Sequence, residues 1–386
     1  MLKQSYHIQE DIIEWRRDFH MHPELGFQEV RTSARVADEL EKLGYRVRRG
    51  VGRTGVVADL GEEGGRCIAI RADMDALPIL EANDVPYKSQ IDGTMHACGH
   101  DSHTAMALGA AKLLTQQDFA GKVRFLFQPS EEAGDEEGIS GAPRMIEDGA
   151  MQGVDMIIAL HVDPSTPVGD IHINDGPSSG GVDSWYGVII GKGGHGAAPE
   201  LSVDPFYLVT HVMMALNAIV SRRIAPFAPA VVSVGTLRGG FTENVIPAQL
   251  EITGTLRYTE MEVQHKIHEE IRRAFELAKT LGGNYELRFE IGAPPMNNDT
   301  AVAALIERTA ADLLGREHIS PIPKGLGAED FGAFTQYAPG AMFTLGTLIE
   351  RDERYLHHPR LDLNEAALPI GTAILTETAL RFLKGA

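Results

Sequence analysis

The stretch Cys67-Ile68-Ala69-Ile70-Arg71-Ala72-Asp73-Met74-Asp75 decides the fold. Its apolar run has the length of a buried strand and leads directly into two carboxylates, at the strand end where ligands gather in α/β sheets. Similar apolar runs predict strands over residues 56–60, 123–128, 156–161 and 341–345. Helical patterns cover residues 8–43 with a break at 22–26, then 101–114, 142–148, 300–314, and a last helix from about 365. This alternation predicts an α/β domain whose mixed, mostly parallel sheet is flanked by helices.

The middle of the chain has a different pattern. Strand-like runs cover 185–190, 231–237, 249–256 and 285–291, and long helical patterns cover 204–220 and 263–281. Their order, βαββαβ, is the plan of a ferredoxin-like domain, which is complete by itself. We therefore expect a discontinuous α/β domain, residues 1–180 and 292–386, with an inserted ferredoxin-like domain, residues 181–291.

Composition excludes several classes of partner. The chain of 386 residues has a formal net charge of −19, which nucleic acid and anionic membranes would both repel. No apolar run approaches the ~18 residues that span a bilayer, and the N-terminus lacks the apolar stretch of a secretory signal. Cys67 lies in an apolar run and Cys98 among histidines, so we expect no disulfide and a cytoplasmic location.

Side chains that bind metal ions gather near the ends of these predicted elements. The segment His96-Ala97-Cys98-Gly99-His100-Asp101-Ser102-His103 precedes a helix, the pair Glu131-Glu132 and His161 follow or end strands, and His357-His358 comes late. Thiolate and imidazole together suit zinc and other borderline-soft divalent ions. Each feature alone also fits a solvated turn or a structural histidine. Together they indicate a metal site.

Several longer motifs resemble those of the dinuclear metallo-aminoacylase and carboxypeptidase family, in particular the amidohydrolase branch that includes hippurate hydrolases and auxin-conjugate hydrolases. They run in family order over nearly the whole chain. The matching segments are Arg17-Asp18-Phe19-His20, His22-Pro23-Glu24-Leu25, Asp73-Met74-Asp75-Ala76-Leu77-Pro78, His96-Ala97-Cys98-Gly99-His100-Asp101, Glu131-Glu132, Gly193-Gly194-His195-Gly196-Ala197-Ala198-Pro199, Asn244-Val245-Ile246-Pro247 and His357-His358-Pro359. The family's inserted domain is a ferredoxin-like lid, in agreement with the pattern of residues 181–291.

The resemblance implies two divalent metal ions per subunit, of zinc, manganese, cobalt or nickel. Their ligands would be Cys98, His100, Glu132, His161 and His357. Cys98 would take the bridging place that an aspartate fills in much of the wider family. His357 rather than His358 is chosen by family position, because spacing cannot separate the two.

Further acidic residues receive roles in the same way. Glu131 would be the general base that takes a proton from the metal-activated water and delivers it to the leaving amine. Asp75 would orient a ligand or modulate that base. Asp73 stands where relatives carry a histidine ligand, so it is left out of the ligand set. For His20 and His22 a structural role at a helix end is expected instead of metal binding.

The inserted domain would supply substrate contacts. His195 would donate a hydrogen bond to the oxyanion of the tetrahedral intermediate, and Asn244 would bind that oxyanion or the substrate carboxylate. Arg257 is a candidate clamp for the carboxylate, although a surface salt bridge fits it equally well. Glu200 departs from the histidine that relatives in this branch often carry after Ala-Ala-Pro.

The expected function is metal-dependent hydrolysis of the amide bond of small N-acyl amino acids. A di- or tripeptidase or carboxypeptidase of the same family is the first alternative. A catalytically silent binding protein of this fold is a second, and the presence of Glu131 with the full ligand set argues against it. A redox protein using Cys98 lacks a second cysteine nearby. We also expect a homodimer formed through the lid, with His195 and Asn244 acting on the neighbouring subunit's metals.

Overall fold

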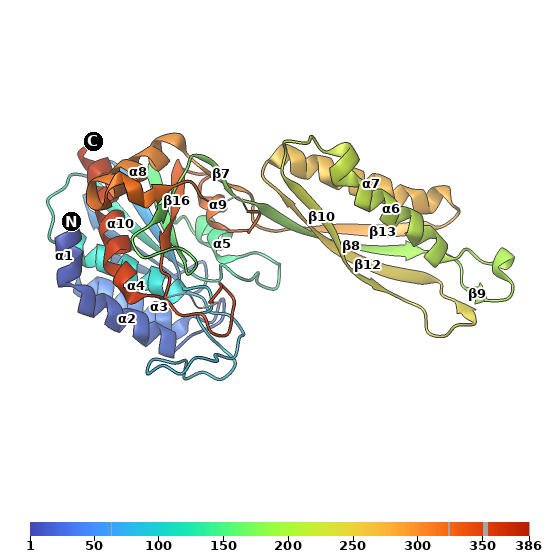
Figure 1. The fold of residues 1–386 in the computed structure, drawn as a ribbon, viewed down its shortest axis with the longest axis horizontal. Helices are drawn as coiled ribbons and strands as arrows, with labels where there is room; N and C mark the ends of the chain where they lie inside the picture. The colour runs from blue at the N-terminus through green and yellow to red at the C-terminus, as the bar shows by residue number, and fades with distance from the viewer. Residues whose placement is uncertain (63, 323–324, 350–353, 386) are drawn as a thin grey trace. The chain divides into compact units, whose positions relative to one another are not determined.

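The computed structural model describes residues 1–62, 64–322, 325–349 and 354–385 (Figure 1). The chain forms two compact units. The first comprises Met1–Ser178, Asn297–Lys324 and Asp330–Ala386, and the second comprises Ser179–Met296 with Gly325–Glu329. The second unit is thus inserted into the first, and the short segment Gly325–Glu329 returns to it late in the chain.

An eight-stranded sheet lies at the centre of the first unit, in the order β1-β2-β4-β3-β5-β16-β6-β15. The deciding stretch forms β3, which runs parallel to β4 and β5, and β16 runs parallel to β5. Pairing is antiparallel for β1-β2, β2-β4 and β16-β6. The predicted mixed, mostly parallel sheet is confirmed. The strands are β1 (Arg46–Val51), β2 (Gly55–Gly61), β3 (Cys67–Asp73), β4 (Lys122–Gln128), β5 (Met156–Asp163), β6 (Ile171–His172), β15 (Ile319–Ser320) and β16 (Gly340–Gly346).

Helices cover both faces of this sheet, which explains why every residue of β3 is buried. Ile68 and Ile70 pack into a core shared with α2, α4 and α10. Cys67 and Ala69 alternate with them and so face the other side, where Figure 1 shows α5 and α9. The helices are α1 (Leu2–His7), α2 (Gln9–Met21), α3 (Val30–Lys42), α4 (His100–Leu114), α5 (Gly141–Glu147), α8 (Thr300–Leu314), α9 (Phe331–Phe334) and α10 (Leu368–Lys384).

The second unit is a four-stranded antiparallel sheet covered on one face by two helices (Figure 1). Its elements follow as β8 (Gly181–Ile190), α6 (Pro205–Arg223), β10 (Ala230–Arg238), β12 (Gln249–Tyr258), α7 (Met261–Thr280) and β13 (Asn284–Ile291). The order along the chain is βαββαβ, and the order across the sheet is β10-β12-β8-β13. Trp185 and Ile189 of β8 join a core with both helices. This unit therefore has a hydrophobic core of its own.

One helical stretch of the described residues, Glu365–Lys384, has the length and hydropathy to cross a membrane. Its most apolar window is 78% buried inside the protein. This is the behaviour of a core helix, and α10 indeed contributes residues to the core of the first unit.

Candidate metal centre

A glycine turn places Cys98 and His100 on either side of the start of α4. Gly99 has a left-handed φ of 89°. A Cβ at this position would lie 2.5 Å from Cγ2 of Val162, so the turn requires glycine. His100 is the first residue of α4, and both Cys98 and His100 are buried, at 7% and 1% exposure.

His100 and His161 each offer one ring nitrogen as a possible metal ligand near Cys98. Nδ1 of His100 lies 3.0 Å from the carbonyl oxygen of Asp75, and Nδ1 of His161 lies 2.8 Å from that of Val162. A carbonyl only accepts, so Nδ1 carries the proton in both rings and Nε2 is left as an acceptor. Nε2 of His161 lies 3.4 Å from Sγ of Cys98. Nε2 of His100 is buried without a hydrogen bond to the described residues, which fits a nitrogen that binds metal.

The sulfur of Cys98 belongs to two groups of ligand atoms. Cys98, His100 and His161 offer atoms that all lie within 4.8 Å of one another, and so do Cys98, Glu132 and His357. Nε2 of His357 lies 2.9 Å from Oε1 of Glu132. The structure therefore brings together all five residues of the expected ligand set, with the sulfur common to both groups.

The donor atoms of these residues are of the types that bind a divalent cation. Burial raises the pKa of the Cys98 thiol well above its ordinary value, whereas a coordinated divalent ion deprotonates a thiol. Burial also opposes ionisation of Glu132, but the hydrogen bond from His357 holds its pKa below the usual range. The hydrogen bond with Glu132 raises the pKa of His357. One thiolate, one carboxylate and three imidazoles are a donor set suited to zinc and similar ions.

Asp75 links the two sides of the centre. Its Oδ1 lies 3.1 Å from Nδ1 of His100, and its Oδ2 accepts the backbone N–H of Glu132 at 3.0 Å. Glu131 offers a carboxylate oxygen within 4.8 Å of ligand atoms of His100 and Glu132. A carboxylate next to the ligand groups is in the position that proton transfer to or from a bound water requires.

Asp73 and His103 both form hydrogen bonds with other protein groups. The sequence did not reveal this role of His103. Oδ1 of Asp73 lies 2.6 Å from Nδ1 of His103, and Oδ2 accepts from Arg71 at 2.6 Å. Nε2 of His103 accepts the backbone N–H of Val162 at 3.0 Å. Asp73, His100 and His103 also bring ligand atoms within 4.8 Å of one another, but both ring nitrogens of His103 already have partners. The sequence signal that could have indicated the contact between Arg71 and Asp73 is their spacing, because residues two apart on a strand share a face.

His195 and Asn244 lie together in the second unit. The short strands β9 (Gly194–His195) and β11 (Val245–Ile246) pair, with His195 opposite Val245, and the N–H of Gly196 donates to the carbonyl of Asn244 at 2.8 Å. Both side chains are exposed. A pocket of about 520 Å³ adjoins them, lined among others by Phe206, Phe241 and Pro247.

Arg257 lies on β12, at the end of the four-stranded sheet that is far from β9. It pairs with Val182 near the start of β8, whereas Gln249 pairs with Ile190 at the end of β8, beyond which β9 lies (Figure 1). Eight residue steps at about 3.4 Å make about 27 Å along the strand. The guanidinium donates to Thr255 Oγ1 and Leu256 O of its own strand. One copy of this unit cannot bring Arg257 and His195 to the same small ligand.

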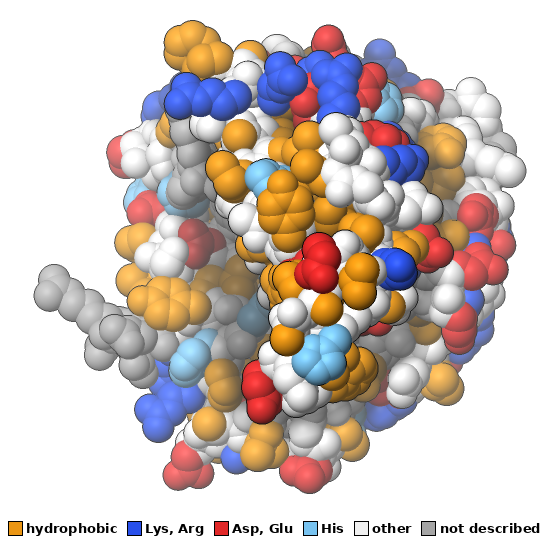
Figure 2. Space-filling view, turned by 90° about the vertical axis from the view of Figure 1, so that its right-hand side faces the viewer, with side chains coloured by type: hydrophobic (Ala, Val, Ile, Leu, Met, Phe, Trp, Pro, Cys, Tyr) orange, Lys and Arg blue, Asp and Glu red, His pale blue; other side chains and the backbone are white. Residues whose placement is uncertain are grey.

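Hydrophobic side chains are exposed on the second unit around β9. Figure 2 views this end of the molecule, with hydrophobic groups in orange. Phe241 is 98% exposed, Leu201 68% and Val245 48%. Contiguous apolar groups on a surface are typical of sites that contact another molecule.

The fold, the two groups of candidate ligands and the adjacent carboxylate fit a metal-dependent hydrolase. Residues 69–381 match the family described as peptidase family M20/M25/M40, and the chain belongs to this family, as the resemblance predicted.

Named relatives extend over nearly the whole chain. An N-acetyl-L-cysteine deacetylase of Bacillus subtilis is 39% identical over 383 residues, covering 97% of this chain and 89% of the relative. Thermostable carboxypeptidase 2 of Saccharolobus solfataricus is 38% identical over 383 residues, covering 97% and 96%. A solved Bacillus subtilis structure, described as a dinuclear metal-binding peptidase of the M20 family, has a TM-score of 0.85 at 35% identity and covers 99% of this chain and 100% of its own. The protein is therefore a hydrolase of a family with dinuclear metal-binding members.

Proposed function

We propose that this hydrolase cleaves the amide bond of small N-acyl amino acids, giving a carboxylic acid and a free amino acid. The observation that carries the proposal is the sulfur of Cys98 shared by two ligand groups, with Glu131 beside them. In this reading Cys98, His100 and His161 would hold one ion, and Cys98, Glu132 and His357 would hold the other.

The residues of the chain then have distinct tasks. When bound, two divalent ions supply a Lewis acid for the acyl oxygen and lower the pKa of a water molecule. Glu131 accepts the proton of that water, whose oxygen bonds to the acyl carbon. Glu131 then delivers the proton to the amine nitrogen as the carbon–nitrogen bond breaks. Asp75 keeps the His100 ring and the backbone of Glu132 in position during these steps.

The names of the relatives support this substrate class and also its main alternative. One is a deacetylase of an N-acetylated amino acid, and another is a carboxypeptidase. Their substrates share an amide carbonyl next to an amino acid and differ in what lies on the acyl side. A peptidase is therefore the second candidate. A cytoplasmic location is part of the proposal, because reducing conditions keep a cysteine such as Cys98 from forming disulfides.

A homodimer formed through the second unit, acting as a lid, is also part of the proposal. In it, His195 and Asn244 donate hydrogen bonds to the oxyanion at the neighbouring chain's metals. The separation of about 27 Å between the two ends of β8 supports this, because Arg257 and His195 can serve one small substrate only if they come from different chains. The exposed apolar side chains around β9 support a protein contact there.

A substrate panel tests the proposal. The protein is stripped with a chelator and assayed with N-acetyl, N-benzoyl and indole-acyl amino acids and with di- and tripeptides, after adding manganese, zinc, cobalt or nickel. We expect no turnover before the ion is added and preference for the acylated amino acids afterwards. Turnover of peptides alone would favour the second candidate. Full turnover in a preparation shown by elemental analysis to be metal-free would falsify the mechanism, and binding without turnover under every condition would indicate a silent protein.

A further inference from the structure

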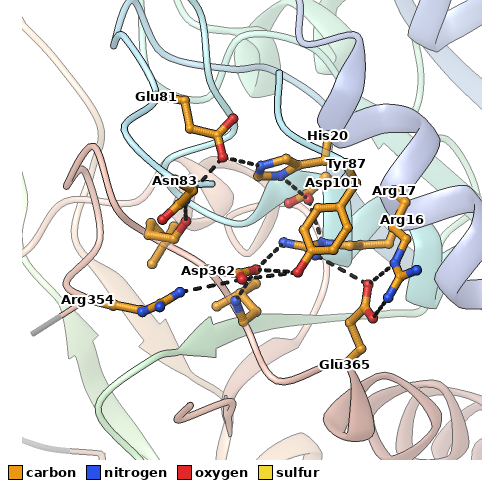
Figure 3. A network of polar contacts seen from close by, with 12 residues as sticks. Arg16, Arg17, His20, Glu81, Asn83, Tyr87, Asp101, Arg354, Asp362 and Glu365 are labelled. Carbon is orange, nitrogen blue, oxygen red and sulfur yellow. Dashed lines mark hydrogen bonds and ion pairs between the residues drawn. The ribbon is translucent and has the colours of Figure 1, made fainter. Parts of the chain in front are cut away.

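A buried arginine connects two segments that supply candidate ligands, the start of α4 and the segment after His357 (Figure 3). Arg16, on α2, is 1% exposed. Its Nε donates to Oδ2 of Asp101 at 2.9 Å, and its Nη2 donates to Oδ1 of Asp362 at 3.1 Å. Asp101 directly follows His100, and Asp362 lies five residues after His357 in the sequence. One guanidinium thus joins α2, the start of α4 and the C-terminal segment.

Further polar contacts fix the same C-terminal segment (Figure 3). The hydroxyl of Tyr87 donates to Oδ2 of Asp362 at 3.0 Å. His20, also on α2, contacts Asp101 at 2.8 Å and Glu81 at 3.3 Å. Asn83 extends these contacts to the C-terminal segment. Its Nδ2 donates to Glu81 at 3.1 Å and to the carbonyl of Leu361 at 2.8 Å. The segment after His357 is therefore held on two sides by residues of the N-terminal part of the chain.

The ring of His357 contacts Oε1 of Glu132 through Nε2 at 2.9 Å but is largely open to solvent. Its side chain is 52% exposed, and its φ of 64° is left-handed. Its backbone N–H donates to the carbonyl of Ala97, the residue before Cys98. His100, in contrast, is buried, and its ring is oriented by Asp75. The position of the His357 ring therefore depends on the anchoring of its segment as well as on Glu132, whereas burial and Asp75 hold the His100 ring.

Stability alone does not account for this arrangement. A buried ion pair costs desolvation energy that its attraction barely offsets, and hydrophobic replacements are often as stable. Arg16 contacts three carboxylates, those of Asp101, Asp362 and Glu365, from two distant segments, and a guanidinium does so in a fixed fork geometry. Such a group specifies relative position more than it adds stability.

We propose that Arg16 is a positioning residue of the metal centre. Through Asp101 and Asp362 it fixes the His357 segment against the start of α4. Weakening this link lowers the affinity for the ion bound by Cys98, Glu132 and His357, and leaves the ion bound by Cys98, His100 and His161 nearly unchanged. The inference rests on the two-ion reading of the proposed function.

Titration of the stripped full-length protein with Mn²⁺ tests it, by calorimetry and by elemental analysis after dialysis. The variants are Arg16→Lys, which keeps the charge but loses the fork, and Asp362→Asn, which keeps the shape of the carboxylate. Arg49→Gln is the matched control, because Arg49 is 42% exposed and pairs with Asp38 and Glu41, which are not part of this network. We expect two ions in the wild type, and in both test variants one ion bound about 10- to 100-fold more weakly, the range for loss of a supporting partner. The control should match the wild type.

The outcomes separate the inference from the proposed function. Two ions bound with wild-type affinity in Arg16→Lys and Asp362→Asn, even at a lower melting temperature, would show a purely structural network and overturn the inference alone. Equal weakening of both ions would also overturn it. Fewer than two ions in the wild type would overturn the two-ion reading and the inference with it. Because Asp362→Asn leaves Arg16 paired with Asp101, it gives a folded protein to measure if Arg16→Lys does not.

Discussion

The backbone N–H of Ser130 donates a hydrogen bond of 2.8 Å to Oε1 of Glu29. Glu29 is fully buried, and its other oxygen accepts from Thr54 Oγ1 at 2.5 Å. Ser130 has a left-handed φ of 45°, which residues with a Cβ rarely adopt. Gly26 lies against it so closely that a Cβ there would be 2.2 Å from Oγ of Ser130. This contact supports the turn that presents Glu131.

The pKa of Glu29 leads to a pH dependence of stability. Burial raises it from 4.5 to about 7. The folded protein therefore binds a proton at Glu29 that the unfolded chain releases, and this contribution to stability is lost as pH rises from about 4.5 to about 7. Glu29→Gln removes the titration. We expect its free energy of unfolding, relative to the wild type, to increase across this window by up to about 3 kcal/mol.

Urea denaturation of both proteins at pH 5, 6, 7 and 8 measures this difference. Thr54→Val is a control, since it removes a hydrogen-bond partner of Glu29 but leaves the carboxyl group in place. A difference between Glu29→Gln and the wild type that is the same at every pH would contradict the assigned titration.

The two adjacent glutamates should respond differently to the same substitution. Glu131→Gln is expected to keep the metal content and to lower kcat by several orders of magnitude, because it removes the proton carrier alone. Glu132→Gln should lose metal as well, since a candidate ligand is neutralised. Elemental analysis beside kcat distinguishes them. Equal metal loss in both variants would show that the roles are wrongly divided.

Asp75→Asn tests the support of the centre. Asp75 contacts His100 and the backbone N–H of Glu132, and replacement by an amide places a donor where one of these donors was accepted. We expect about 10- to 100-fold weaker metal binding or activity, as for other partners of metal ligands. Asp155→Asn serves as a control, because Asp155 accepts the N–H of Cys67 at the opposite end of β3. Unchanged affinity in Asp75→Asn would remove Asp75 from the centre.

Mixing two inactive chains tests the shared site. His195→Ala and Glu131→Gln are combined under conditions of subunit exchange. If His195 serves the neighbouring chain, each hybrid dimer has one intact site and regains up to about half of the wild-type activity by two-fold symmetry. If it serves its own chain, no site is whole and no activity returns. A monomer at assay concentration, measured by light scattering, would also refute the shared site.

Local patterns allowed much of the fold to be predicted. The apolar runs ending in Asp73, Gln128 and His161 became β3, β4 and β5 because burial on both faces leaves a continuous apolar signature. β1 was missed, since its residues Arg46–Val51 are mostly exposed and charged. The two-residue strands β6 and β15 were missed because such short segments carry no periodicity.

Without the family resemblance, the candidate site was predictable only where its chemistry is local. Cys98 and His100 stand in one motif, so their residue types alone indicated a metal. Arg16 and Asp362 are 346 residues apart, and nothing in either neighbourhood indicates which carboxylate the guanidinium meets. The separation of Arg257 from His195 was also hidden, because strand register decides it and a single sequence does not reveal register.

The place of β16 has a consequence for biosynthesis. β5 pairs with β3 on one side and with β16 on the other, and Gly340–Gly346 leaves the ribosome only after the whole inserted unit. At about 5 to 20 residues per second this takes roughly 10 to 35 s. During that interval the nascent chain holds an apolar strand with one open edge, a template for wrong pairing. The second unit has a core of its own. It can therefore fold during this interval, before β16 pairs with β5 and completes the sheet of the first unit.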